Sequence, residues 1–210
     1  MKIISTNISK PTTIIWNGKE EQTGIYKYPI SNSIYLGKSD VLKDTVIDRI
    51  HHGGTNKACY IFSSDKYGYW KNMYPNLEWN WGMFGENLTV QGLDESVLRI
   101  GSIYKVGECL VQITQPREPC YKLGIRFGTQ NILKEFIDHG FPGTYIRVLE
   151  EGEVKVGDSF ILTEESKNIL TVQQFYQLLY AKEKNLDIIK IAIENDTLPK
   201  RKKEKLKKYL

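Results

Sequence analysis

The chain has 210 residues, of which 40% are hydrophobic and 26% are charged. This length suits one main domain with a small appendage, and the composition is that of a folded protein rather than a disordered one. No hydrophobic run approaches the roughly 18 residues of a membrane span, and the N-terminus lacks the pattern of a secretory signal. We therefore expect a cytoplasmic protein with no membrane partner.

The formal net charge of +4 comes largely from one segment near the C-terminus, Lys200 to Lys208, with the sequence KRKKEKLKK. A run of this kind is most often the solvated face of a helix. Nucleic-acid binding by the run is therefore an unfavoured alternative, which salt-dependent binding to mixed DNA would reveal.

Short runs rich in β-branched and aromatic residues extend from Ile3 to Leu162 and are separated by Gly, Asn and Asp. They cover residues 23–30, 59–64, 87–93, 96–106, 108–114, 144–150 and 159–162. This spacing predicts a mainly β fold, a barrel or a sandwich.

Two segments share one short pattern, LRIGSIY at 98–104 and VKVGDSF at 154–160. Each pattern predicts a strand, a tight turn and a second strand, with Gly101 and Gly157 at the bends.

Two helices are predicted to interrupt the strands. Tyr67, Trp70 and Tyr74 have helical spacing, and a hydrophobic stripe over 132–137 ends at Gly140. His139 lies in the last turn of the second helix, where a positive charge would suit the helix dipole, and we expect no catalytic role for it.

The strand pattern stops after Thr163. Residues 171–183, residues 186–193 and the basic segment after Pro199 predict three helices. We expect residues 1–163 to form the β domain and residues 164–210 to form a small three-helix module. A module this small cannot hold a deep core alone, so we expect it to pack on the β domain.

The three cysteines are an odd number, so they do not indicate a disulfide framework. Cys109 alternates with Val111 and Ile113 along one strand face, and Cys59 lies inside another strand-like run. Both are interpreted as structural. Neither a C-x-x-C nor an H-x-x-x-H pair occurs, which argues against a zinc site.

Cys120 differs from the other two because it follows a predicted strand in the segment TQPREPCYKL. Pro116 and Pro119 restrict the backbone and place the thiol on a stiff loop at a strand end. Arg117 and Lys122 would favour the thiolate, which attacks electrophiles or binds soft metals. The alternative is that Cys120 is simply a small buried hydrophobic residue.

The segment HHGGTNKA, residues 51–58, contains two adjacent glycines with His52 and Lys57 on either side. Such a backbone can turn its N–H groups toward an anion, so the segment predicts a phosphate cradle. A plain turn is the alternative.

The segment FGENLT, residues 84–89, places Glu86 and Asn87 after a tight turn at Gly85. Their acceptors and donors suit a polycyclic amide such as a pterin. The alternative is an ordinary hairpin turn.

The segments HGGTNKA, FGENLTVQGL and TQPREPCYKL occur in an order and at separations that resemble the MOSC domain family. GTYIRVLEEGEVKVGD at 143–158 and the TVQ segment at Thr171 resemble the YiiM-like branch of that family. The resemblance covers nearly the whole chain. It implies a MOSC-type β-barrel followed by a three-helix C-terminal domain.

The resemblance also implies a site and an activity. The cleft of the barrel would hold the pyranopterin molybdenum cofactor, with Cys120 as the protein ligand of molybdenum. The side chains around the pterin and its phosphate would be those of His52, Lys57, Glu86, Asn87 and Arg117. The implied activity is the two-electron reduction of N-hydroxylated compounds, such as N-hydroxylaminopurines, to amines.

Electrons for this reaction need a separate source. The chain has no Cys-rich iron–sulfur motif and no Rossmann glycine pattern. We therefore expect an external electron-donating reductase as a partner. Two alternatives use the same residues: a sulfur carrier with a persulfide on Cys120, which would work without molybdenum, and a non-catalytic protein that binds or stores the cofactor.

Overall fold

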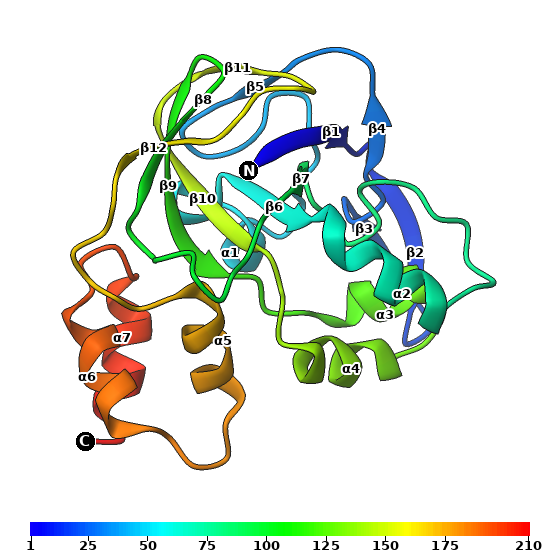
Figure 1. The fold of residues 1–210 in the computed structure, drawn as a ribbon. Coiled ribbons are helices and arrows are strands. Elements are labelled where there is room, and N and C mark those ends of the chain that lie inside the picture. The colour runs from blue at the N-terminus through cyan, green and yellow to red at the C-terminus, as the bar shows by residue number, and fades with distance from the viewer.

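The computed structural model describes the backbone of residues 1–210 and all side chains except those of Ile50 and His51. Eight strands form one mixed sheet in the order β12-β8-β9-β10-β6-β7-β1-β4 (Figure 1). Neighbouring strands are antiparallel except β6 and β7, which are parallel. The strands are β1 (Lys2–Ile8), β4 (Tyr28–Ile30), β6 (Cys59–Ser63), β7 (Leu88–Gln91), β8 (Ile103–Val106), β9 (Cys109–Pro116), β10 (Thr144–Glu150) and β12 (Ile161–Glu164).

The sheet curves into a half-barrel whose two sides meet at the start of β1. The N–H of Ile3 donates to the carbonyl of Asp158 at 2.9 Å, and the N–H of Phe160 donates to the carbonyl of Met1 at 2.9 Å. A second small sheet pairs β5 (Ile34–Leu36) with β11 (Gly152–Val154). The expectation of a mainly β fold with a few helices is confirmed.

The two copies of the shared sequence pattern fold differently. The second copy lies between two strands: β11 ends at Val154, a turn follows at Gly157 with φ of 98°, and β12 begins at Ile161, just after the copy. In the first copy only the strand after Gly101 forms, so the strand predicted over residues 98–100 is wrong. The reason is that the backbone of Leu98 and Ile100 bonds to the segment around Leu170 rather than extending a strand.

Helices cover the lower side of the sheet in Figure 1. The two predicted helices form as α2 (Tyr67–Met73) and α4 (Asn131–His139). The chain also forms α3 (Tyr121–Phe127), the short α1 (Arg49–His52), and the 3-10 turns η1 (Thr55–Lys57) and η2 (Ser64–Lys66), none of which was predicted. These helices enclose an aromatic core in which Phe62, Trp70, Phe84 and Phe136 are fully buried.

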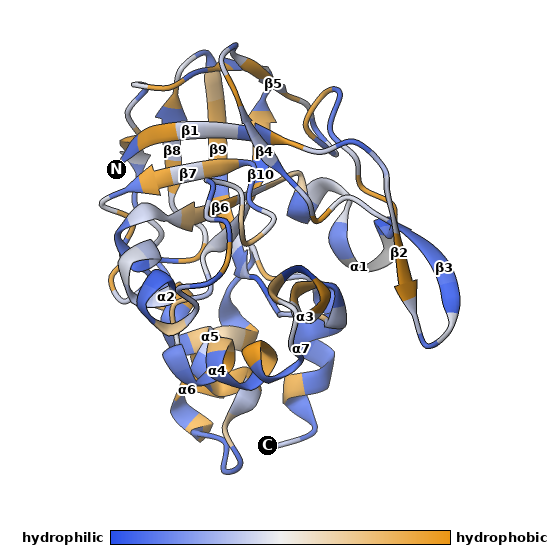
Figure 2. Ribbon diagram, turned by 90° about the vertical axis from the view of Figure 1, so that its right-hand side faces the viewer, coloured by the Kyte–Doolittle hydropathy of each residue, from blue (hydrophilic) through white to orange (hydrophobic). Residues whose placement is uncertain are grey.

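A two-stranded ribbon, β2 (Thr12–Trp16) and β3 (Lys19–Thr23), projects from the body of the molecule (Figure 2). It was not predicted, and neither was β1. The ribbon is anchored at its far end to α3, because the ring of Trp16 stacks on that of Tyr121 with centroids 4.8 Å apart.

The C-terminal segment forms α5 (Val172–Tyr180), α6 (Leu186–Glu194) and α7 (Lys200–Lys207). Thr171 and Gln174 make a capping box that starts α5. Phe175, Ile189 and Leu206 share one hydrophobic core with Val111 of β9, so the helices pack against the sheet. That core is continuous across residue 163, and the division into domains 1–163 and 164–210 stays a prediction. None of the described helices is long and apolar enough to span a membrane.

His139 lies at the end of α4 as predicted, but its ring is neutral at pH 7. The imidazole packs 5.0 Å from the Trp70 ring and 4.5 Å from the Tyr69 ring. This burial, with a smaller contribution from the charge of Lys66, lowers its pKa to about 4. The ring therefore does not carry, at pH 7, the positive charge that would suit the helix dipole.

The half-buried His139 should make the protein less stable in mild acid. An unfolded histidine titrates near pH 6.5 and the folded one near pH 4, so protonation favours the unfolded chain. The contribution to stability is complete above pH 6.5 and is lost as the pH falls toward 4. In His139→Phe, urea unfolding measured from pH 7 to pH 4.5 should show a shallower loss of stability than the wild type. An equal loss in both proteins would contradict the assignment.

Candidate functional site

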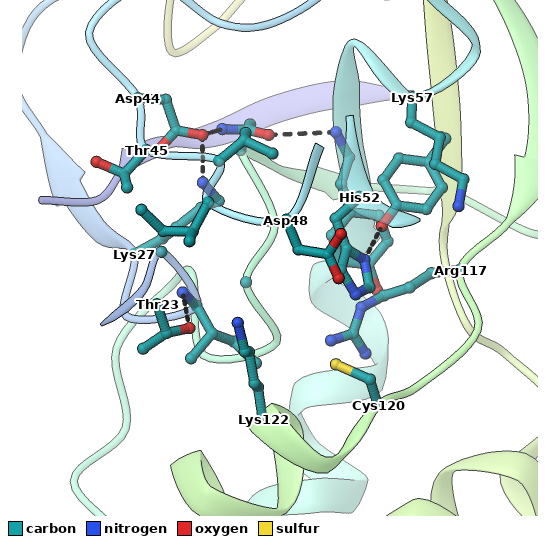
Figure 3. Close-up of a pocket in the computed structure, with 18 of the residues that line it drawn as sticks. Thr23, Lys27, Asp44, Thr45, Asp48, His52, Lys57, Arg117, Cys120 and Lys122 are labelled. Carbon is teal, nitrogen blue, oxygen red and sulfur yellow. Dashed lines mark hydrogen bonds and ion pairs between the residues drawn. The ribbon is translucent and has the colours of Figure 1, made fainter. Parts of the chain in front are cut away.

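A pocket opens between the loop at 44–48, α1, η1 and the start of α3 (Figure 3). One cavity of about 90 Å³ is lined among others by Lys27, Asp44 and Asn87. Beside it lies a wider cleft of about 360 Å³. Both are lined by His52, Lys57 and Cys120 among others, so the two cavities form one continuous site.

Cys120 is the cysteine that faces this pocket (Figure 3). It is the N-cap residue of α3, directly after the loop that ends β9, so its predicted strand-end position is confirmed. Its side chain is half-exposed, whereas Cys59 and Cys109 are 1% and 0% exposed. Burial raises the pKa of both these thiols, that of Cys109 to about 11. Cys120 is therefore the accessible thiol, and the other two belong to the core as predicted.

Arg117 brings a buried positive charge to the same pocket. The residue is 4% exposed, and its guanidinium lies 5.3 Å from the centroid of the Tyr60 ring. Figure 3 shows the guanidinium beside the thiol of Cys120. The Nη1 atom is buried and has no hydrogen-bond partner among the described residues. A buried donor left unpaired is costly, so this N–H group suits an acceptor supplied by a ligand.

His52 and Lys57 also line the pocket. The Nδ1 atom of His52 lies 3.3 Å from the hydroxyl of Tyr145. Burial, together with the smaller effect of the charges of Arg117 and Lys57, lowers the pKa of His52 to about 4, so the ring is neutral at pH 7. Burial also lowers the pKa of Lys57. Between them, Gly54 has φ of 87°, a conformation that favours glycine and that a plain turn and the predicted cradle would share.

Asn87 lines the pocket, but its amide is already bonded within the wall. Its Nδ2 donates to Oδ2 of Asp44 at 2.8 Å, and its Oδ1 accepts the N–H of Tyr60 at 3.2 Å. Asp44 also forms a buried ion pair with Lys27. Sequence reasoning missed Lys27 and Asp44. Lys27 could have been noticed because it lies inside the strand-like run TGIYKYPI, where a charged side chain needs a partner of opposite charge.

The structure does not bring Glu86 to the pocket. Its side chain is fully buried, and Oε1 accepts from the N–H of Gly82 at 2.9 Å and from the hydroxyl of Thr89 at 2.8 Å. The Tyr67 hydroxyl and the Phe84 N–H also donate to this carboxyl group. Burial raises the pKa of Glu86. Glu86 therefore stabilises the turn that carries Asn87. The sequence had led us to expect a direct contact between Glu86 and the pterin instead.

Lys122 and Tyr145 complete the wall near Cys120. Lys122 was expected there as a neighbour of the thiol, whereas sequence reasoning gave Tyr145 no place in the site. Lys122 is carried by α3, the helix that the sequence reading did not predict. The sequence did contain an indication of this helix, because Leu123 and Phe127 are four residues apart and Gly128 follows them. Gly128 ends the helix with φ of 72°.

Comparisons with known proteins agree with this architecture. Residues 48–160 match the model of the MOSC domain. Over 196 residues, 93% of this chain and 88% of the relative, the chain is 34% identical to the uncharacterized protein YflK of Bacillus subtilis (strain 168). The crystal structure of YiiM from Geobacillus stearothermophilus matches with a TM-score of 0.83 and 30% identity, covering 100% of this chain and 98% of that one.

A third similarity is to a longer protein. The chain is 30% identical over 175 residues to a protein named Reductase from Gibberella moniliformis (strain M3125 / FGSC 7600). The match covers 82% of this chain but only 31% of that protein. The chain therefore corresponds to less than a third of that relative.

Proposed function

Because the chain belongs to the MOSC domain family, we propose that it binds the molybdenum cofactor and reduces N-hydroxylated compounds, such as N-hydroxylaminopurines, to amines. One observation carries the proposal: an accessible thiol and a buried, unpartnered guanidinium N–H line the same pocket. The name of the Gibberella relative supports a redox role.

The residues present fit this cofactor. Cys120 offers a soft thiolate that would hold the metal. Arg117, Lys57 and His52 would lie around the pterin and its phosphate, where the unpaired N–H of Arg117 would find an acceptor. Asn87 and Glu86 would shape the wall through their own hydrogen bonds. When bound, the cofactor would supply the two-electron redox chemistry that cleaves the N–O bond.

The reaction consumes two electrons and two protons for each substrate, and it yields one amine and one water. The electrons would come from an external electron-donating reductase. The lowered pKa of Lys57 would let its ammonium group give up a proton more readily than an exposed lysine does. His52 would be neutral at pH 7, and so would accept a hydrogen bond rather than donate a proton from a charged ring.

The test compares protein purified from a cofactor-competent host with cofactor-free protein. Molybdenum content is measured by elemental analysis, and amine formation from N-hydroxylaminopurine is followed with a reduced viologen dye as electron donor. Product should form with the loaded protein alone. Equal rates in both samples would assign the chemistry to the dye. A fully loaded protein without activity would favour the storage function, and persulfide transfer without molybdenum would favour the sulfur carrier.

A further inference from the structure

A third cavity of about 390 Å³ lies between the C-terminal helices and the cleft of Cys120. Its charged lining is almost entirely basic: Lys57, Lys184, Arg201, Lys202 and Lys205, with Glu118 as the one carboxylate. Three of the five cations come from α7, the helix formed by the basic run near the C-terminus. The function that we propose from the family assigns no role to this basic segment.

The single carboxylate does not neutralise these cations. Glu118 pairs with Lys202, whose Nζ lies 2.5 Å from Oε1. The side chains of Arg201 and Lys205 form neither an ion pair nor a hydrogen bond with any described residue. The Nζ of Lys184 donates to the carbonyl of Leu178 at 2.7 Å, which leaves its charge uncompensated. The cavity therefore presents a net positive charge to whatever enters it.

The effect of this charge is visible at Lys57. Burial is the largest cause of the lowered pKa of Lys57, and the positive charges of Lys202 and Arg201 also lower it. The carboxylates of Glu118 and Asp48 act in the opposite direction. An anion in the cavity would relieve this repulsion.

The remaining wall of the cavity is apolar and aromatic. Leu178, Leu179 and Tyr180 come from α5 and its end, while Leu206 and Tyr209 come from α7 and the residues after it. A cavity of this size that combines cations with apolar side chains suits a small organic anion better than an inorganic ion. Arginine and lysine are the side chains that recognise phosphate groups.

The basic cavity adjoins the proposed reaction site. Lys57 and Glu118 line both the basic cavity and the cleft that contains Cys120. Glu118 precedes Cys120 by two residues, which is at most about 7 Å of chain. One ligand can therefore reach the thiol with one end and the basic cavity with the other.

We propose that this cavity binds the phosphate of a nucleotide, so that the N-hydroxylated substrate is a nucleoside phosphate rather than a free base. Arg201, Lys202 and Lys205 hold the phosphate, the leucine and tyrosine side chains contact the ribose, and the N-hydroxylated base extends toward Cys120. This assignment of the substrate class rests on the proposed reductase function. The occupancy of the basic cavity by a phosphate is independent of it.

The binding test uses adenosine monophosphate and titration calorimetry on the full-length protein, with and without cofactor. In the double variant Arg201→Gln/Lys205→Gln, affinity should fall about tenfold or more, since two unpaired cations are removed. The matched control is Lys200→Gln/Lys208→Gln, which removes the same charge from the same segment outside the cavity lining. The control should bind as the wild type does. Equal losses in both variants, or no loss in either, would overturn the proposal.

A kinetic arm separates this inference from the proposed function. With the loaded protein, the double variant should raise KM for the monophosphate of N-hydroxyadenosine and leave kcat, and KM for N-hydroxyadenosine itself, unchanged. Reduction of the nucleoside without any binding of the nucleotide would overturn the inference and leave the reductase function standing. Nucleotide binding without reduction of any substrate would overturn the reductase function alone. Binding to cofactor-free protein but not to loaded protein would assign the cavity to the cofactor and overturn the substrate assignment.

Discussion

Replacing Cys120 with alanine is expected to abolish the reduction of N-hydroxylaminopurine and to leave the thermal midpoint within a few degrees of the wild type. The thiol is half-exposed at the start of α3, so its removal costs little packing energy. Its loss removes the proposed protein ligand of molybdenum. Activity is measured with the viologen assay, and the midpoint by thermal unfolding followed by circular dichroism.

Cys109→Ala is the matched control, because it removes the same atoms from a fully buried position. The variant should lose about 1 to 2 kcal/mol of unfolding free energy through the small cavity that it leaves, and it should keep its activity. A Cys120 variant that stays active would remove the basis of the site assignment. The same follows if Cys109 proves to be the essential thiol.

The second large effect is expected on stability, at Glu86. Alanine at this position should lower the free energy of unfolding by about 3 kcal/mol or more, because buried donors lose their acceptor and each unpaired donor is costly. Those donors are the N–H groups of Gly82 and Phe84 and the hydroxyl groups of Tyr67 and Thr89. Urea unfolding at pH 7 measures the loss.

Glu86→Gln provides the comparison, because the amide keeps the size of the side chain and one acceptor oxygen. Its loss of stability should be smaller, and the folded protein should still bind molybdenum when it is prepared from a cofactor-competent host. A Gln variant of normal stability that cannot retain the cofactor would instead favour the direct cofactor contact expected from the sequence.

Local sequence patterns predicted the strands and helices whose buried face is defined by the spacing of their own hydrophobic residues. The alternation of Cys109, Val111 and Ile113 predicted a strand with one buried face, and β9 has all three fully buried. The spacing of Tyr67 and Trp70 predicted α2, in which both are buried. By contrast, β1 and the ribbon of β2 and β3 carry weaker local patterns. Their strands are stabilised by pairing with β7, β4 and each other, which no local pattern specifies.

The sequence by itself determined that Cys120 lies on a loop just after a strand, that Cys59 and Cys109 lie in the core, and that the C-terminal residues form helices. These features follow from the hydrophobic period and from the restrictions that proline and glycine impose on the backbone. Only the tertiary structure decided that Glu86 points into its own turn, that Arg117 keeps a buried N–H unpaired, and that α7 brings its cations to the basic cavity. The position of α7 depends on segments distant in sequence, such as Glu118 and Lys202, whose contacts are selected by the packing of the whole chain.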